Sequence, residues 1–131
     1  MKRRIMLATG ALLFLSLAAS SKEAGRQPLA LPLDCEVGDC PILKGAPQTA
    51  GLRSGLVRLK PGESVGWHTT GAHEEALVIL RGSGEAEMEK RAPMPVTARM
   101  MAYIPPETRH NVKNTSDQML EYVYVVAPVA H

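Results

Sequence analysis

Four side chains of the kinds that bind metals gather in one half of the chain, at His68, His73, Glu75 and His110. His73 and Glu75 open a run, "HEEALVIL", that has the composition of a β-strand. Residues two apart share one face of a strand, so His73 and Glu75 point the same way if the strand has begun by His73. Neutral imidazole and carboxylate together suit divalent iron, manganese, nickel, zinc or copper, and ligand type alone does not select among them. These residues predict a site for a divalent transition metal.

The sequence around each of these residues indicates whether it binds a metal or faces solvent. Glu75 stands beside the apolar run "ALVIL", where a carboxylate without a partner is costly to bury, and binding a metal would relieve that cost. Glu74 has the opposite parity, so we expect it to face outward. His73 serves equally well as a solvated loop histidine. His110 is the only other histidine inside the predicted domain.

The elements that must position these ligands are short strands. From Leu52 onward, segments rich in Val, Ile, Leu and Tyr are separated by Gly and Pro. The predicted strands are residues 55–59, 64–69, 75–81, 85–89, 100–104, 109–113 and 119–126. No stretch after the N-terminal region offers an amphipathic helix of about ten residues or more. The class is therefore all-β, a barrel or a sandwich. We expect Trp67, Tyr103, Tyr122 and Tyr124 to pack in it, with lining of a pocket as the alternative.

Two motifs resemble those of the cupin family. Gly62, His68, Glu75 and Gly82 are spaced like its first motif, and Pro105, Glu107, His110 and Asn114 are spaced like its second. The resemblance spans roughly residues 52–128. It implies a single jelly-roll barrel, also called a double-stranded β-helix, of about six to eight strands. It also implies a metal inside one mouth of the barrel, held by histidines and a carboxylate.

The chain departs from the family pattern at three motif positions. Thr70 stands where the family has its second histidine, and Arg99 and Glu107 occupy positions of motif glycines. The absence of one customary ligand weakens the metal inference more than the fold inference. His73 is the candidate replacement, reaching the site from the loop. Asn114 is expected to stabilise a turn.

The N-terminal residues have the plan of a secretory signal peptide. A basic head precedes an apolar stretch and a small-residue exit over residues 1–21, with cleavage expected near residues 19–21. An uncleaved anchor is the alternative. Without the three basic residues of the head, the formal net charge changes from +2 to −1, and no basic stripe remains for nucleic acid. The predicted location is periplasmic or secreted, with no stable membrane insertion after cleavage.

Between the leader and a domain over residues 51–128 lies an arm, residues 22–50, rich in Pro and Gly and without strand periodicity. It holds the only two cysteines, Cys35 and Cys40. An exported chain meets an oxidising compartment, which favours a disulfide between them. Half of a zinc site is the rival interpretation, but no second cysteine pair exists to complete it.

Three functions fit these observations. The first is an exported metalloenzyme that acts on a small molecule by oxygenase chemistry or by isomerase or lyase chemistry. The second is a non-catalytic barrel that binds a small molecule or carbohydrate, which the replacement of a ligand by Thr70 favours. The third is an interaction protein that has lost its metal. A homodimer is expected, because the apolar segment 119–126 could pair along an edge of the sheet.

Overall fold

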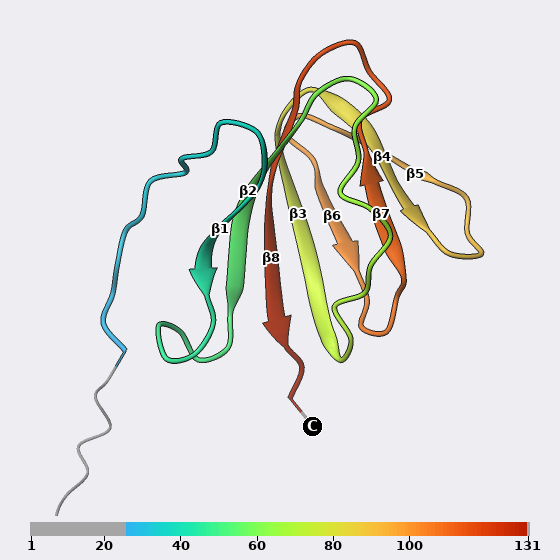
Figure 1. Cartoon of the computed structure of the whole chain (residues 1–131). Helices are drawn as coiled ribbons and strands as arrows, with labels where there is room; N and C mark the ends of the chain where they lie inside the picture. The colour runs from blue at the N-terminus through green and yellow to red at the C-terminus, as the bar shows by residue number, and fades with distance from the viewer. Residues whose placement is uncertain (1–25, 131) are drawn as a thin grey trace, which may run out of the picture.

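The computed structural model describes residues 26–130, and the predicted signal peptide lies outside this range. All regular elements of the described chain are β-strands (Figure 1). They are β1 (Gly38–Lys44), β2 (Arg53–Leu59), β3 (His73–Arg81), β4 (Ser83–Met88), β5 (Met94–Thr97), β6 (Met101–Ile104), β7 (His110–Lys113) and β8 (Leu120–Pro128). Within residues 26–130, no helix is long and apolar enough to cross a membrane.

Two sheets form the predicted jelly-roll barrel. The larger has the strand order β1-β2-β8-β3-β6 and the smaller β5-β4-β7. Alternation along β3 shows how the sequence builds the interior: Glu75, Leu77 and Ile79 are buried, while the residues between them face outward. The core contains these two apolar side chains together with Val57, Leu59, Ala86, Val96, Ala102, Ile104, Val112, Leu120 and Tyr122. Each large apolar side chain buried there stabilises the fold by about 1.5–3 kcal/mol.

Two positions tie the sheets together. Gly82, which joins β3 to β4, has a φ of 77° and lies so close to the Met119 carbonyl that no side chain would fit. Asn114 is fully buried and donates through Nδ2 to the carbonyls of Leu59 (2.8 Å) and Gln118 (2.6 Å). The expectation that Asn114 stabilises a turn is confirmed.

The strand pattern differs from the prediction at β1, β5 and β8. The arm is irregular over residues 26–35, but β1 follows it and pairs with β2, so the prediction of no strand before residue 50 was wrong there. β5 was also missed. β8 lies between β2 and β3, so the segment expected to pair as an edge strand is central, and the sheet edges are β1 and β6. β1 is irregular at Pro41, where its register with β2 shifts, and this interruption hides its strand periodicity.

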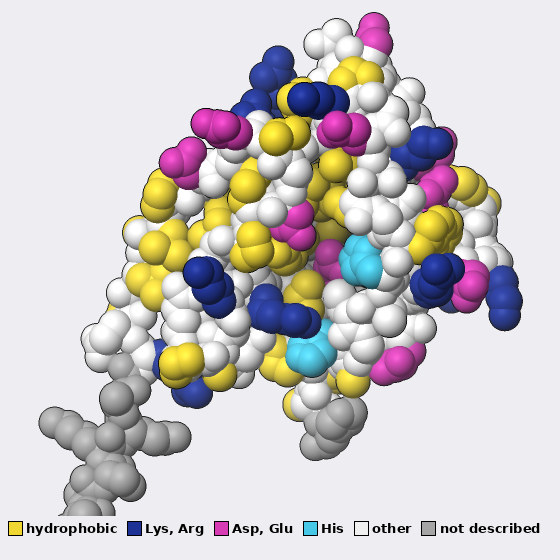
Figure 2. All heavy atoms as spheres, in the orientation of Figure 1, with side chains coloured by type: hydrophobic (Ala, Val, Ile, Leu, Met, Phe, Trp, Pro, Cys, Tyr) yellow, Lys and Arg dark blue, Asp and Glu magenta, His cyan; other side chains and the backbone are white. Residues whose placement is uncertain are grey.

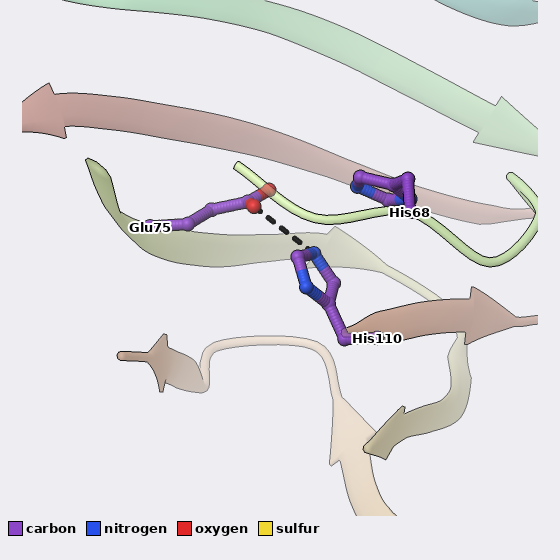
Figure 3. Close-up of side chains that lie close together, drawn as sticks. All are labelled: His68, Glu75 and His110. Atoms are coloured by element: carbon purple, nitrogen blue, oxygen red, sulfur yellow. Dashed lines mark ion pairs between the residues drawn. The ribbon is translucent and has the colours of Figure 1, made fainter. Parts of the chain in front are cut away.

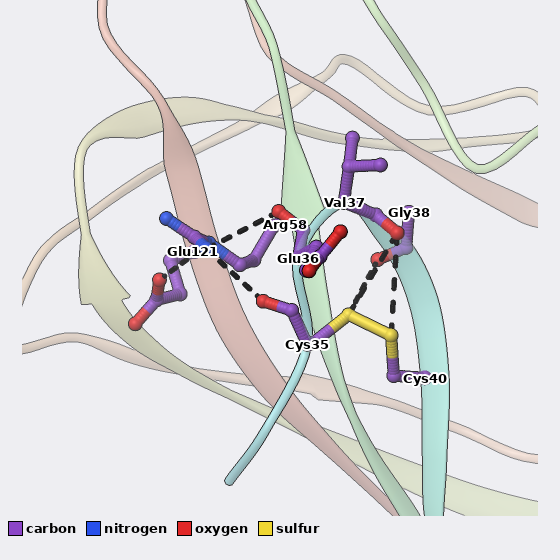
Figure 4. Close-up of a disulfide and its surroundings, with 7 residues drawn as sticks. All are labelled: Cys35, Glu36, Val37, Gly38, Cys40, Arg58 and Glu121. Atoms are coloured by element: carbon purple, nitrogen blue, oxygen red, sulfur yellow. Dashed lines mark hydrogen bonds and ion pairs between the residues drawn. A yellow bond between two sulfur atoms is a disulfide. The ribbon is translucent and has the colours of Figure 1, made fainter.

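A disulfide and an arginine fasten the start of β1 (Figure 4). Cys35 and Cys40 are bonded, as predicted. Arg58 on β2 donates to the carbonyls of Cys35 (3.0 Å) and Glu36 (3.2 Å), and its Nε lies 3.0 Å from a carboxylate oxygen of Glu121. Because Arg58 and Glu121 are also register partners of β2 and β8, the arm is attached to the middle of the larger sheet.

Candidate metal centre

His68 and His110 are held side by side by their own main chains. The His68 N–H donates to the His110 carbonyl (2.9 Å) and the His110 N–H donates to the His68 carbonyl (2.8 Å). Such a reciprocal pair places two side chains on the same face of an antiparallel ladder. The two imidazole centroids are accordingly 4.3 Å apart.

The strand predicted over residues 64–69 is interrupted, and the interruption aims His68. Ser64 bridges Lys113 and His68 bridges His110, so one extra residue lies on this side of the pairing. The irregularity contains Gly66, which has a φ of 88° and donates from its N–H to the Asn111 side chain (3.0 Å). Strict alternation would send Val65 and His68 to opposite faces, yet both line the same cavity. The extra residue therefore turns His68 inward.

Glu75 completes a group of three donors (Figure 3). It enters from β3, with 5% of its surface exposed, while His110 from β7 is fully buried and His68 is solvent-exposed at the mouth. One ligand atom from each of the three residues lies within 4.8 Å of the others. Three segments that are distant in sequence thus converge on one point.

Backbone hydrogen bonds decide which imidazole nitrogen faces this point. Nδ1 of His68 lies 2.8 Å from the Gly66 carbonyl, and Nδ1 of His110 lies 2.9 Å from the Thr108 carbonyl. A carbonyl can only accept, so both Nδ1 atoms carry a proton, and in the neutral form of each ring Nε2 is the unprotonated nitrogen. Such a second contact orients the histidine ligands of metal sites.

The buried pair of His110 and Glu75 therefore brings two acceptors together. His110 Nε2 and Glu75 Oε2 are 3.0 Å apart, and neither atom has another partner within residues 26–130. Burial by itself lowers the pKa of His110, but the contact with Glu75 and the Thr108 carbonyl outweigh it, and the net pKa is raised. A proton or a metal cation between the two atoms relieves the repulsion. Two nitrogen donors and one carboxylate fit a divalent transition metal.

The structure leaves one of the four predicted ligands outside this group. His73 begins β3 and is not among the three clustered donors, so its role as a ligand stays a prediction. Thr70, at the position of the family's second histidine, lines the cavity, and its hydroxyl donates to the His73 carbonyl (2.9 Å). Glu74 accepts from the Tyr103 hydroxyl at an exposed site (3.1 Å), which confirms that it faces outward.

A cavity of about 230 Å³ opens beside His68 and Glu75. Figure 2 shows histidine and acidic side chains in a hollow bordered by hydrophobic ones. Tyr122 and Tyr124 line this cavity and also pack against the core, so the expected packing and its alternative both hold for them. Trp67 and Tyr103 are exposed, so the expected packing was wrong there. Burial, followed by nearby carboxylates, raises the pKa of both phenols, that of Tyr124 to about 12.

Two charged residues of the cavity wall, Asp39 and Arg53, were not predicted. Asp39 lies on the strand that sequence reasoning missed, and Arg53 lies at the start of β2. The sequence contained one indication for Arg53: it lies four residues before Val57, so both side chains point to the same face of the strand. Both line the cavity.

The two replaced glycines keep a glycine-like backbone. Arg99 has a φ of 73° and Glu107 a φ of 55°, both in the left-handed region that favours glycine. Their N–H groups donate to the carbonyls of Ile79 (2.9 Å) and Gly71 (2.7 Å). The turn geometry of the family pattern is therefore retained despite the substitutions.

The fold and the site define a small β-barrel protein with a candidate metal centre at one mouth. The cupin domain family matches residues 55–126, more than half of the chain. The chain therefore belongs to the cupin family, as its motifs indicated.

Individual relatives agree with this assignment. Protein SchB from Streptomyces halstedii is 30% identical over 87 residues, which are 64% of this chain and 62% of SchB. This chain thus matches less than two thirds of SchB. A Bacillus halodurans crystal structure has a TM-score of 0.67 at 22% identity and covers 82% of this chain and 86% of that one. A Cupin 2 conserved barrel domain protein from Salinispora arenicola has a TM-score of 0.59 at 25% identity, over 76% and 85%. These likenesses support the barrel fold.

Proposed function

We propose that this cupin binds a divalent transition metal through His68, Glu75 and His110 and acts on a small molecule in the adjoining cavity. The observation that carries the proposal is the buried contact between His110 Nε2 and Glu75 Oε2, at 3.0 Å with no other partner in the described chain. A cation satisfies both acceptors at once. The Nδ1 contacts of both histidines already hold the rings in the required tautomer.

The donor set favours oxygenase chemistry. Two histidines and one carboxylate with open positions are typical of non-haem iron oxygenases, where the bound metal activates dioxygen. Thr70 is a weak ligand for such an ion, so it leaves a further position open toward the cavity. The protein's own part is to orient the substrate against Tyr122 and Tyr124 and to limit access of water. Lewis-acid isomerase or lyase chemistry is the second enzymatic reading.

A binding module without turnover is the alternative function. The replacement of the family's second histidine by Thr70 favours it, because a site that only holds a ligand can function with fewer metal ligands. An unchanged compound recovered in stoichiometric amount from metal-loaded protein would support this alternative over catalysis.

We also propose that the protein is exported. The Cys35–Cys40 disulfide supports this, because disulfides persist in oxidising compartments. N-terminal sequencing of the chain recovered from its producing cells tests it, with a start near residues 20–22 expected. A chain that begins at Met1 would contradict cleavage.

Elemental analysis of the natively purified protein tests the metal proposal. We expect about one equivalent of a transition metal, lost in His110→Ala and strongly reduced in His68→Ala. Glu74→Gln is the matched control, since this carboxylate faces outward beside Tyr103, and it should retain the metal. His73→Ala tests the fourth predicted ligand. Full metal content in the double variant of His68 and His110 would overturn the proposal. Oxygen uptake by iron-loaded protein with candidate substrates then separates oxygenase chemistry from the other readings.

A further inference from the structure

Three strands of the larger sheet build a polar wall in the cavity away from the family motifs. Asp39 comes from β1, Arg53 from β2 and Tyr124 from β8, and all three line the cavity that contains His68 and Glu75. Asp39 and Arg53 lie outside residues 55–126, the part of the chain that matches the cupin domain. The charged part of this wall is therefore an addition of this chain to the matched domain.

Gly55 gives Tyr124 its place in the wall. The two residues are register partners, and a Cβ at position 55 would lie 2.6 Å from the Tyr124 hydroxyl and 2.7 Å from its ring carbons. Real Cβ atoms essentially never come so close, so the Tyr124 ring lies across β2 only because residue 55 is glycine. The ring thereby extends toward β1, where Gly55 pairs with Pro41 and Asp39 lies two residues before Pro41 on the same face of the strand.

The two charges of the wall are opposite and act on the same hydroxyl. Asp39 raises the pKa of Tyr124 and Arg53 lowers it, and both charged side chains line the same cavity as the phenol. A carboxylate has about four lone-pair sites, so Asp39 can accept several hydrogen bonds. Arg53 offers donors only. The wall thus presents acceptors and donors together at no net charge.

This combination selects a neutral polar group over an ion. A charged ligand group would be attracted by one of the two side chains and repelled by the other. A hydroxyl group instead donates to Asp39 and accepts from Arg53. At the metal centre, which borders the same cavity, a divalent ion with a single carboxylate ligand keeps a positive charge, which favours an anionic ligand oxygen.

We propose that Asp39, Arg53 and Tyr124 form a subsite for the hydroxyl groups of a polyhydroxylated carboxylic acid whose carboxylate lies at the metal centre. The subsite rests on the proposed metal centre and specifies the substrate class of that site. Asp39 lies inside the ring closed by the Cys35–Cys40 disulfide, and Arg58 holds two carbonyls of the same ring. The disulfide therefore acts as a positioning element for Asp39.

Calorimetric titration of Zn²⁺-loaded protein tests the subsite, because zinc has no redox chemistry that would consume the probe. The probes are D-glycerate, D-erythronate and D-gluconate, each compared with the unsubstituted acid of the same length, propanoate, butanoate or hexanoate. D-Glucitol supplies hydroxyls without a carboxylate. We expect at least one hydroxylated acid to bind about tenfold or more tightly than its unsubstituted counterpart, since hydrogen bonds to charged groups are involved.

The variants separate the subsite from the metal centre. Asp39→Asn and Tyr124→Phe should each reduce the preference for the hydroxylated acid, by about tenfold for Asp39→Asn, with zinc content and the affinity for the unsubstituted acid unchanged. Asp117→Asn is the control, an exposed aspartate in the turn before β8 that does not line the cavity.

The outcomes are distinct. Zinc-loaded protein that binds hydroxylated and unsubstituted acids equally would overturn the subsite and leave the metal centre standing. A preference that persists in both Asp39→Asn and Tyr124→Phe would overturn the assignment to these residues. Protein that takes up no zinc would overturn the proposed function and the subsite with it.

Discussion

Glu75→Gln should separate the stability of the metal-free fold from its affinity for metal. In the wild type above the folded pKa of His110, the carboxylate is buried 3.0 Å from an unprotonated His110 nitrogen, without another partner in the described chain. A glutamine amide can donate to that nitrogen and carries no charge. We therefore expect Glu75→Gln to stabilise the metal-free protein and to weaken metal binding strongly.

The magnitude follows from the cost of a buried polar group without a partner, about 1–3 kcal/mol and more for a charge. For a domain of about 100 residues, this corresponds to a rise in Tm of roughly 5–15 °C. Metal at about 100 times its Kd should stabilise the wild type by about 2.7 kcal/mol. That metal-induced increase should be absent in the variant.

The pH dependence adds a second check. The pKa of His110 is raised in the folded state, because the contacts with Glu75 and the Thr108 carbonyl outweigh the opposing effect of burial. The proton of His110 therefore stabilises the metal-free wild type below pH of about 6.5, and this contribution is lost as the pH rises through the folded pKa. The advantage of Glu75→Gln should accordingly grow as the pH rises through that range.

Thermal unfolding after chelator treatment, with and without added Zn²⁺, measures both effects. Glu74→Gln is the matched control, because Glu74 is adjacent in sequence but faces solvent beside Tyr103. It should leave the metal-induced change in Tm intact. A Glu75→Gln protein that is less stable than the wild type and still gains the full stabilisation from zinc would refute the reasoning.

Three further predictions concern binding, the turns and the arm. Metal affinity should fall as the pH drops through the raised pKa of His110, since His110 must lose its proton to bind the metal. Affinity that stays constant from about pH 8 to 5 would show that other residues bind the metal. Arg99→Gly should stabilise the fold by about 0.5–1 kcal/mol, because relief of the strained left-handed backbone exceeds the entropy cost of glycine. Urea unfolding measures the free energy of unfolding. A loss of stability would show that contacts of the Arg99 side chain contribute more than its backbone strain costs. Reduction of the Cys35–Cys40 disulfide with a phosphine should weaken binding of the hydroxylated acid while zinc content stays constant; equal binding before and after reduction would show that Asp39 keeps its position without the disulfide.

Sequence reasoning identified the barrel because hydrophobic alternation and turn residues are local properties. The parity of Glu75, Leu77 and Ile79 was readable along β3, and Asn114 was readable as a turn residue. His68 and His110 were paired through the spacing of two motifs. Their direct hydrogen-bonded contact depends on the register between the segment around Gly66 and β7, which no local pattern specifies.

The polar wall of the cavity illustrates what remained out of reach. Asp39 belongs to a short strand with a register shift at Pro41, so alternation there is broken and the strand resembles a loop. Its approach to Tyr124 further requires that residue 55 be glycine, a relation between two strands that are distant in sequence. Contacts between strands that are distant in sequence produce no periodic pattern of residues along the chain.

The exchanged main-chain hydrogen bonds between His68 and His110 have a consequence for ion choice. Because these two imidazoles are carried by directly paired residues of one antiparallel bridge, the distance between them is set by the main chain and resists adjustment to the size of the ion. Glu75 reaches the same point through a longer, more flexible side chain. Ions of different radius should therefore be accommodated by movement of the Glu75 side chain, while the distance between the two imidazole nitrogens stays constant.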